Sequence, residues 1–211
     1  MKHIMFDVDG TLVESYDFDE QCFLEAVQEV TGLGVINNWE TYPHVTDRGI
    51  LGTFIERQAQ QYSIEELEEL VKPVFVSKIK DYLASNPAQE VEGAIKFVEH
   101  LKSESDVVLS IATGGWGDTA VEKLKSAGFD LSGIPLASSN DHHSRIEIMK
   151  LAIVKAVNTD NVPLTYFGDA EWDVRACKDL GVNLVIVGSR VNHNQVLSDF
   201  TNIYKAMSYV Q

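Results

Sequence analysis

The stretch HIMFDVDGTL, residues 3–12, sets the fold that we expect for this chain. Its first residues form a short apolar run that is typical of a buried strand, and Gly10 permits a sharp turn directly after it. Because residues two apart in extended backbone share a face, the carboxylates of Asp7 and Asp9 point the same way. Such neighbours repel each other unless a cation or a shared proton neutralises them. Open α/β sheets bind ligands at the carboxyl ends of their strands, so we predict a functional site here.

Short apolar runs and helical patterns alternate along most of the chain. The predicted buried strands are His3–Phe6, Val107–Ala112, Leu136–Ser138, Leu164–Phe167 and Asn183–Val187. The helical patterns between them are Val91–Lys102, Thr119–Ala127, Arg145–Val157 and Glu171–Leu180. Two glycines that directly follow such helices, Gly128 and Gly181, fit left-handed helix ends. The alternation predicts the α/β class, with a doubly wound, mainly parallel Rossmann-like sheet covered by helices on both faces.

Residues 14–88 interrupt this alternation, because they carry only helical patterns. The expected helices are Asp19–Val30, Asp47–Gln61, Ile64–Lys72 and Pro73–Leu83. Ser63 and Glu66 form a capping-box pattern, and Pro73 suits the first turn of a new helix. The segment is far longer than a strand-to-helix loop. We therefore predict a helical cap subdomain at residues 14–88, inserted into an α/β catalytic core made of residues 1–13 and 89–211.

Two later segments have the chemistry of a phosphate site. Thr113 and Gly114 follow a predicted strand, where a hydroxyl and exposed backbone N–H groups suit an anion. A capping-box pattern beginning at Ser144 puts Arg145 in the first turn of a helix. The helix dipole and the guanidinium would together bind phosphate there. Lys150 is the alternative cation, more than one turn further along the same helix.

A fourth segment adds carboxylates. Asp169 follows the strand predicted at residues 164–167, and Asp173 lies one helical turn later. With Asp7 and Asp9, these side chains would meet at one edge of the sheet. Several convergent carboxylates without a histidine or cysteine ligand pattern favour a hard divalent cation, so we predict Mg²⁺.

Composition limits the classes of partner. The chain has 211 residues, with 32 acidic and 17 basic side chains and a formal net charge of −15. This charge repels nucleic acid and anionic membranes, and no apolar stretch is long enough to cross a bilayer. Two cysteines are too few for a disulfide framework or a zinc site. We expect a cytoplasmic protein that binds a small molecule, without nucleic-acid or membrane partners. The sequence does not indicate an oligomeric state.

The four segments, in their order along the chain, resemble the four motifs of haloacid dehalogenase-superfamily hydrolases. They are Asp7–Thr11, Thr113, Arg145, and Gly168–Asp169 with Asp173. The resemblance covers the α/β core from end to end. The insertion after the first motif resembles the cap of the helical-cap branch, which includes phosphoglycolate phosphatases. The third-motif cation is often a lysine followed by proline in this superfamily, and here an arginine stands at that position.

The resemblance implies roles for the acidic residues. Asp7 would be the nucleophile that forms an aspartyl-phosphate, and Asp9 would act first as general acid and then as general base. Mg²⁺ would be held by Asp7, Asp169 and the backbone carbonyl of Asp9, with Asp173 orienting the metal shell.

The resemblance also implies how substrate is held. Thr113, Gly114 and Arg145 would bind the phosphate oxygens that are not transferred. The cap would close over the phosphate and select the leaving group. In a polar stretch between two cap helices, His44 and Arg48 are the candidate substrate contacts.

We therefore expect a Mg²⁺-dependent phosphomonoester hydrolase that acts on a small phosphorylated metabolite. Two alternatives stay open from the sequence. A phosphosugar mutase would use the same aspartyl-phosphate but return the phosphoryl group to a sugar, and no motif substitution separates it from a phosphatase. A non-catalytic phospho-ligand binding module is disfavoured, because pure binding would not require an acid at Asp9.

Overall fold

The computed structural model describes residues 1–157 and 162–210. Within them, six parallel strands form one sheet in the order β3-β2-β1-β4-β5-β6. The strands are β1 Lys2–Phe6, β2 Val107–Ala112, β3 Leu136–Ala137, β4 Leu164–Gly168, β5 Asn183–Val187 and β6 Val196–Leu197. The first five match predicted strands to within one residue at each end, so the α/β class is confirmed. The sequence analysis missed β6, because two residues are too few for a recognisable pattern.

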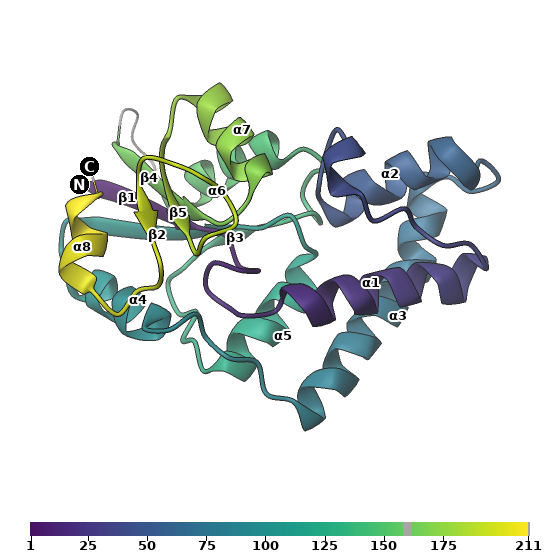
Figure 1. The fold of residues 1–211 in the computed structure, drawn as a ribbon, viewed down its shortest axis with the longest axis horizontal. Helices are drawn as coiled ribbons and strands as arrows, with labels where there is room; N and C mark the ends of the chain where they lie inside the picture. Colours follow the sequence, from purple (N-terminus) through teal and green to yellow (C-terminus); the bar gives the residue numbers. More distant parts are fainter. Residues whose placement is uncertain (158–161, 211) are drawn as a thin grey trace.

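Helices cover both faces of the sheet (Figure 1). On one face lie α4 Ala94–Ser103, α5 Gly117–Ala127 and α8 Ile203–Ser208, and on the other lie α6 Arg145–Ala156 and α7 Glu171–Leu180. The central strand shows why both faces are needed. Ile4 and Phe6 pack in the cluster that includes α4 and α5, whereas Met5 packs with α6 and α7. Since successive side chains of a strand point to opposite faces, an uninterrupted apolar run must be covered twice.

The sheet order places a crevice at the carboxyl end of β1. Strands β2 and β3 lie to one side of β1, and β4, β5 and β6 lie to the other, so the chain reverses its direction of winding at β1. Phe6 pairs with Ile111 of β2 and with Phe167 of β4. The residues that follow these three strands therefore emerge next to one another, at the kind of switch point where doubly wound sheets bind ligands.

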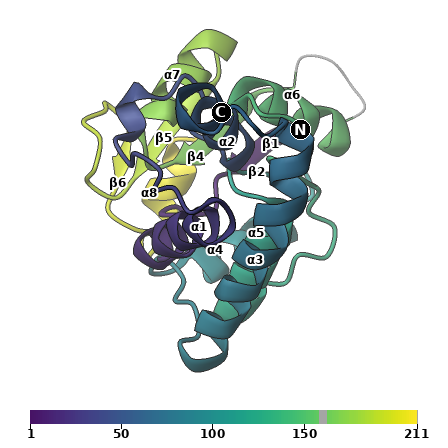
Figure 2. The same ribbon diagram turned by 90° about the vertical axis from the view of Figure 1, so that its right-hand side faces the viewer.

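The segment between β1 and α4 folds into helices beside this edge of the sheet (Figures 1 and 2). They are α1 Tyr16–Thr31, the short 3-10 helix η1 Trp39–Thr41, α2 Asp47–Gln58 and α3 Ile64–Ser85. Their apolar side chains form a cluster of their own, which also takes in Trp116 from the loop after β2. The expected division into a cap at residues 14–88 and a core made of the remainder stays a prediction.

The predicted break at Pro73 is wrong, because α3 continues through it. An interior proline removes a hydrogen bond and costs about 3 kcal/mol or more. The buried residues of α3 recur at intervals of four on both sides of the proline, and each fully buried apolar side chain contributes about 1.5–3 kcal/mol. They are Leu67, Val71, Phe75 and Ile79. Packing of this one face therefore outweighs the local preference for a break.

The helix ends match the predictions in part. The capping box of Ser63 and Glu66 is formed, and Gly128 and Gly181 are both left-handed. Ser144 stands at the start of α6, but its side chain makes no capping hydrogen bond. Both cysteines are free and buried. Among the described residues, no helix combines the length and the apolar character that crossing a membrane requires.

Candidate active site

Asp7 stands directly after β1 and is almost completely buried. Its backbone N–H donates to the carbonyl oxygen of Phe167 at 2.9 Å, which continues the pairing of β1 with β4. Its Oδ2 lies 3.3 Å from the guanidinium of Arg145, whereas Oδ1 is buried and has no hydrogen-bond partner in the described part of the chain. Burial raises the pKa of the Asp7 carboxyl to about 7, against the lowering effect of Arg145.

Asp7, Asp169 and Asp173 form a compact group of buried carboxylates, with one oxygen from each within 4.8 Å of the others. Both side-chain oxygens of Asp169 are buried without a hydrogen-bond partner among the described residues, and the half-exposed Arg190 lies 3.7 Å away. Burial, with Asp173 and Asp7 close by, raises the pKa of Asp169 to about 8. Asp173 is held in place, because its Oδ2 accepts the N–H groups of Asp169 and Ala170 at 3.1 Å. Clustered oxygens that lack partners are the donor set that a hard divalent cation such as Mg²⁺ needs.

Gly10 allows this cluster to lie so close to β1. Its φ angle is +78°, and a Cβ atom there would lie 2.7 Å from Cγ of Asp169. Any other residue would be strained in this conformation and would also collide with the carboxylate.

The side chain of Asp9 has partners of its own outside the group formed by Asp7, Asp169 and Asp173. Its Oδ1 accepts a hydrogen bond from Ser15 Oγ at 2.5 Å and forms an ion pair with Lys123. Lys123, on α5, is fully buried and also pairs with Asp19 of α1 at 2.5 Å. The sequence analysis missed Lys123 and Asp19. A signal for Lys123 exists, since it lies three residues after Ala120 on the buried face of α5.

The predicted phosphate-binding residues meet beside Asp7. Thr113 Oγ1 accepts the N–H of Gly115 at 3.2 Å, which shapes the loop after β2. Arg145 is buried, and its guanidinium contacts Asp173 Oδ1 and the hydroxyl of Tyr166, each at 3.0 Å. The alternative cation is elsewhere: the side chain of Lys150 is 52% exposed and paired with Glu147.

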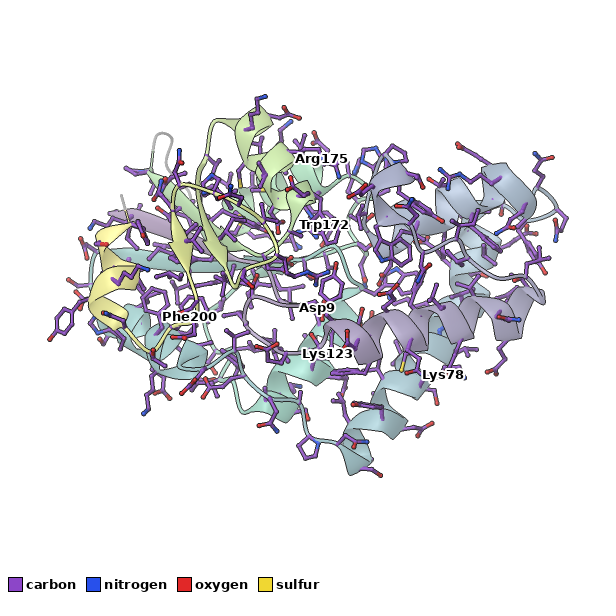
Figure 3. All side chains as sticks on the ribbon, viewed as in Figure 1. Asp9, Lys78, Lys123, Trp172, Arg175 and Phe200 are labelled. Carbon is purple, nitrogen blue, oxygen red and sulfur yellow. The ribbon has the colours of Figure 1, made fainter. Side chains whose placement is uncertain are left out.

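Asp7, Thr113 and Arg145 line a cavity of about 90 Å³ between the sheet edge and the helical region. Figure 3 labels two of the residues that line it, Asp9 at the sheet edge and Trp172 at the start of α7. The lining residues from the sheet side are Asp7, Asp9, Thr113, Gly114, Gly115, Arg145 and Trp172. Those from the helical side are Tyr16, Asp19, Glu20, Phe23, Trp39, Val45, Thr46, Asp47 and Ile50.

The segment before and at the start of α2 is docked on the sheet-edge loops. The N–H of Asp47 donates to the carbonyl oxygen of Gly114 at 2.9 Å, and its Oδ2 accepts the N–H of Trp116 at 2.7 Å. Thr46 Oγ1 donates to the carbonyl oxygen of His143 at 2.6 Å. Thr46 and Asp47, which the sequence analysis did not single out, therefore close one side of the cavity.

The two candidate substrate contacts in this segment do not line the cavity. The guanidinium of Arg48 lies 3.7 Å from Glu65 and 3.5 Å from Glu68. The ring of His44 packs edge-on against His143, with 5.0 Å between ring centroids. A contact of either residue with substrate stays a prediction that this arrangement does not favour.

Comparisons with known proteins agree with this fold. No curated protein matches the chain. A hydrolase from Pseudomonas syringae has 18% identity and a TM-score of 0.77, over 99% of this chain and 98% of its own. A β-phosphoglucomutase from Clostridium difficile has 18% identity and a TM-score of 0.74, over 99% and 97%. A predicted phosphoglycolate phosphatase from Haemophilus somnus has 19% identity and a TM-score of 0.68, over 98% of both chains.

At these identities, likeness to solved structures shows a shared fold. The family assignment comes from the model of the haloacid dehalogenase-like hydrolases, which matches residues 4–187 and so spans β1 to β5, with every motif that the sequence analysis identified. The chain therefore belongs to the haloacid dehalogenase-like hydrolase family and is an enzyme of that family.

Proposed function

We propose that the protein is a Mg²⁺-dependent phosphomonoester hydrolase that acts on a small phosphorylated metabolite through an aspartyl-phosphate. One observation carries the proposal: Asp7, whose buried Oδ1 has no hydrogen-bond partner among the described residues, lines the same cavity as Thr113 and Arg145. Asp169 and Asp173 stand beside it as further carboxylates for a cation. Phosphoryl transfer requires a nucleophile and an anion-binding pair in one small cavity, with a cation site beside the nucleophile.

In the first step, a carboxylate oxygen of Asp7 attacks phosphorus as the bond from phosphorus to the leaving oxygen breaks. Arg145, the Thr113 hydroxyl and the N–H group of Gly114 bind the oxygens that are not transferred. Asp7, Asp169 and the backbone carbonyl of Asp9 would hold a divalent cation, which would supply positive charge that offsets repulsion between the nucleophile and the phosphate.

Asp9 handles the protons in both steps. It donates a proton to the departing alkoxide, and it then removes a proton from the water that attacks the aspartyl-phosphate. That second step releases inorganic phosphate and restores the Asp7 carboxylate. Asp173 supports both steps by holding the backbone of Asp169 and the guanidinium of Arg145.

A phosphatase assay tests the proposal. Phosphate release is measured over sugar phosphates, phosphoglycolate, nucleotides and an aryl phosphate, with Mg²⁺ and with a chelator. We expect turnover of part of this panel, loss of turnover on chelation, and loss with Asp7→Asn. Full activity of Asp7→Asn would exclude it as the nucleophile. No described residue favours the mutase alternative, and transfer of phosphate between positions of a sugar, without release, would establish it.

A further inference from the structure

Burying the charged side chain of Lys123 costs free energy, and no step of the proposed reaction uses this side chain. Its side chain is fully buried on α5, and it is the only lysine among the described residues that is buried. A buried ammonium costs several kcal/mol of desolvation, which a carboxylate partner offsets only with good geometry. Although burial favours the neutral amine, Asp19 and Asp9 raise the pKa of Lys123 above its usual value. Lys123 therefore stays charged between two carboxylates.

The two partners of Lys123 come from different parts of the fold. Asp9 follows β1 at the sheet edge, whereas Asp19 lies in the first turn of α1, the first helix of the region beside the sheet. Figure 3 shows Asp9 and Lys123 close together between the sheet edge and α5. The ion pairs thus link the loop after β1, a helix of the sheet layer and the helical region.

The two carboxylate oxygens of Asp9 differ in their hydrogen bonds. Oδ1 accepts from both Ser15 and Lys123. Oδ2 makes no hydrogen bond within the described part of the chain, and a Cβ atom at Gly115, a cavity-lining position, would lie 3.7 Å from it. One oxygen is therefore anchored, while the other faces the space where the leaving group would lie.

We propose that Lys123 and Asp19 are positioning residues for Asp9. They hold Oδ1 so that Oδ2 is presented to the leaving oxygen in the first step and to water in the second. Because Asp19 belongs to α1, this alignment requires α1 to be seated against α5, which couples proton transfer to the placement of the helical region. The inference rests on the proposed function, since it assigns partners to the general acid and base.

Leaving groups of different basicity distinguish positioning from a merely structural role. An alkoxide needs a proton as it leaves, whereas 4-nitrophenolate does not, and general acid catalysis contributes about 10²–10⁴-fold. The experiment measures the single-turnover rate of Asp7 phosphorylation with propyl phosphate and with 4-nitrophenyl phosphate. For Lys123→Met we expect the propyl rate to fall by about 100-fold or more and the aryl rate to change by less than about five-fold.

Two further variants complete the test. Asp19→Asn leaves Lys123 paired with Asp9, so we expect it to disturb folding less than Lys123→Met and to lower the propyl rate selectively, by about ten-fold. Lys72→Met is the matched control, because Lys72 of α3 pairs with Asp118 of α5 at 2.5 Å and also links the helical region to the sheet layer. It should leave the ratio of the two rates unchanged.

The outcomes separate the two proposals. Equal losses with both substrates in Lys123→Met and Asp19→Asn, or no loss with propyl phosphate, would overturn the positioning role while leaving the proposed function intact. A wild-type protein that phosphorylates Asp7 neither with these two substrates nor with any member of the phosphatase panel would remove the proposed function and this inference with it.

Discussion

Replacing Gly10 by alanine tests the close approach of the first loop to the carboxylate group. Gly10 has a φ of +78°, where a side chain costs about 1–2 kcal/mol. The lower entropy of the unfolded alanine chain returns about 0.4–1 kcal/mol, so strain alone should lower the free energy of unfolding by about 1 kcal/mol. The added Cβ also lies 2.7 Å from Cγ of Asp169, so this carboxylate must move.

Movement of Asp169 should weaken cation binding beyond any loss of stability. Disturbing the groups that orient a metal ligand typically costs 10–100-fold in affinity or activity, and we expect a loss of about that size in Gly10→Ala. Urea unfolding with and without Mg²⁺ measures both effects, because a bound cation stabilises the folded state by an amount that grows with the logarithm of its affinity. Steady-state phosphatase assays over a range of Mg²⁺ concentrations provide a second measure.

Gly133→Ala is the matched control. Gly133 has a φ of +76°, and a Cβ atom there would meet nothing within 4 Å. It should lose a similar amount of stability, about 1 kcal/mol, and keep its Mg²⁺ dependence. If Gly10→Ala keeps wild-type Mg²⁺ affinity and activity, or if both variants lose activity alike, then the crowding of Asp169 does not govern the site.

Three further predictions follow from other parts of the structure. Burial lowers the pKa of His3 to about 4. Between pH 6.5 and 4 the unfolded chain therefore binds a proton at His3 that the folded protein does not bind, so the free energy of unfolding falls as the pH drops from about 6.5 toward 4. Between pH 7 and 5 wild type should lose about 2 kcal/mol more than His3→Gln in denaturant unfolding; parallel pH profiles would contradict this. Asp173→Ala frees the backbone N–H of Asp169 and leaves Arg145 without one partner, so kcat should fall by about 10–100-fold at saturating Mg²⁺, and an unchanged kcat would argue against its supporting role. The helical side of the cavity is acidic, so Glu20→Gln should raise the ratio of kcat/KM for phosphoglycolate to kcat/KM for propyl phosphate, whose leaving group is uncharged, by about two- to ten-fold; an unchanged ratio would argue against repulsion between Glu20 and the carboxylate of the substrate.

Much of the site could be predicted from sequence because its members follow strands. Asp7, Thr113 and Asp169 each stand just after an apolar run, and the carboxyl ends of neighbouring parallel strands meet at one edge of a sheet. Arg145 could be placed by its position in the first turn of a helix. These patterns involve only a few neighbouring residues, so they can be recognised directly in the sequence.

Positions that depend on how the helical region meets the sheet could not be predicted in this way. His44 and Arg48 are the most chemically prominent side chains in their segment, but they pack against His143 and pair with glutamates of α3, whereas Thr46 and Asp47 line the cavity. Sequence chemistry identifies which residues can bind substrate. Only packing decides which way a helix presents them.

The sequence by itself determined the α/β alternation and the acidic strand end of HIMFDVDGTL, because strand and helix periodicities and the repulsion of adjacent carboxylates are local properties. The tertiary structure alone decided which cation pairs with Asp9. Lys123 lies 114 residues away along the chain and pairs with Asp9 because α5 packs beneath the end of β1. The tertiary structure also decided that α3 continues through Pro73. The free energy gained by burying one face of a helix depends on the elements that pack against it, and the sequence of the helix alone does not reveal them.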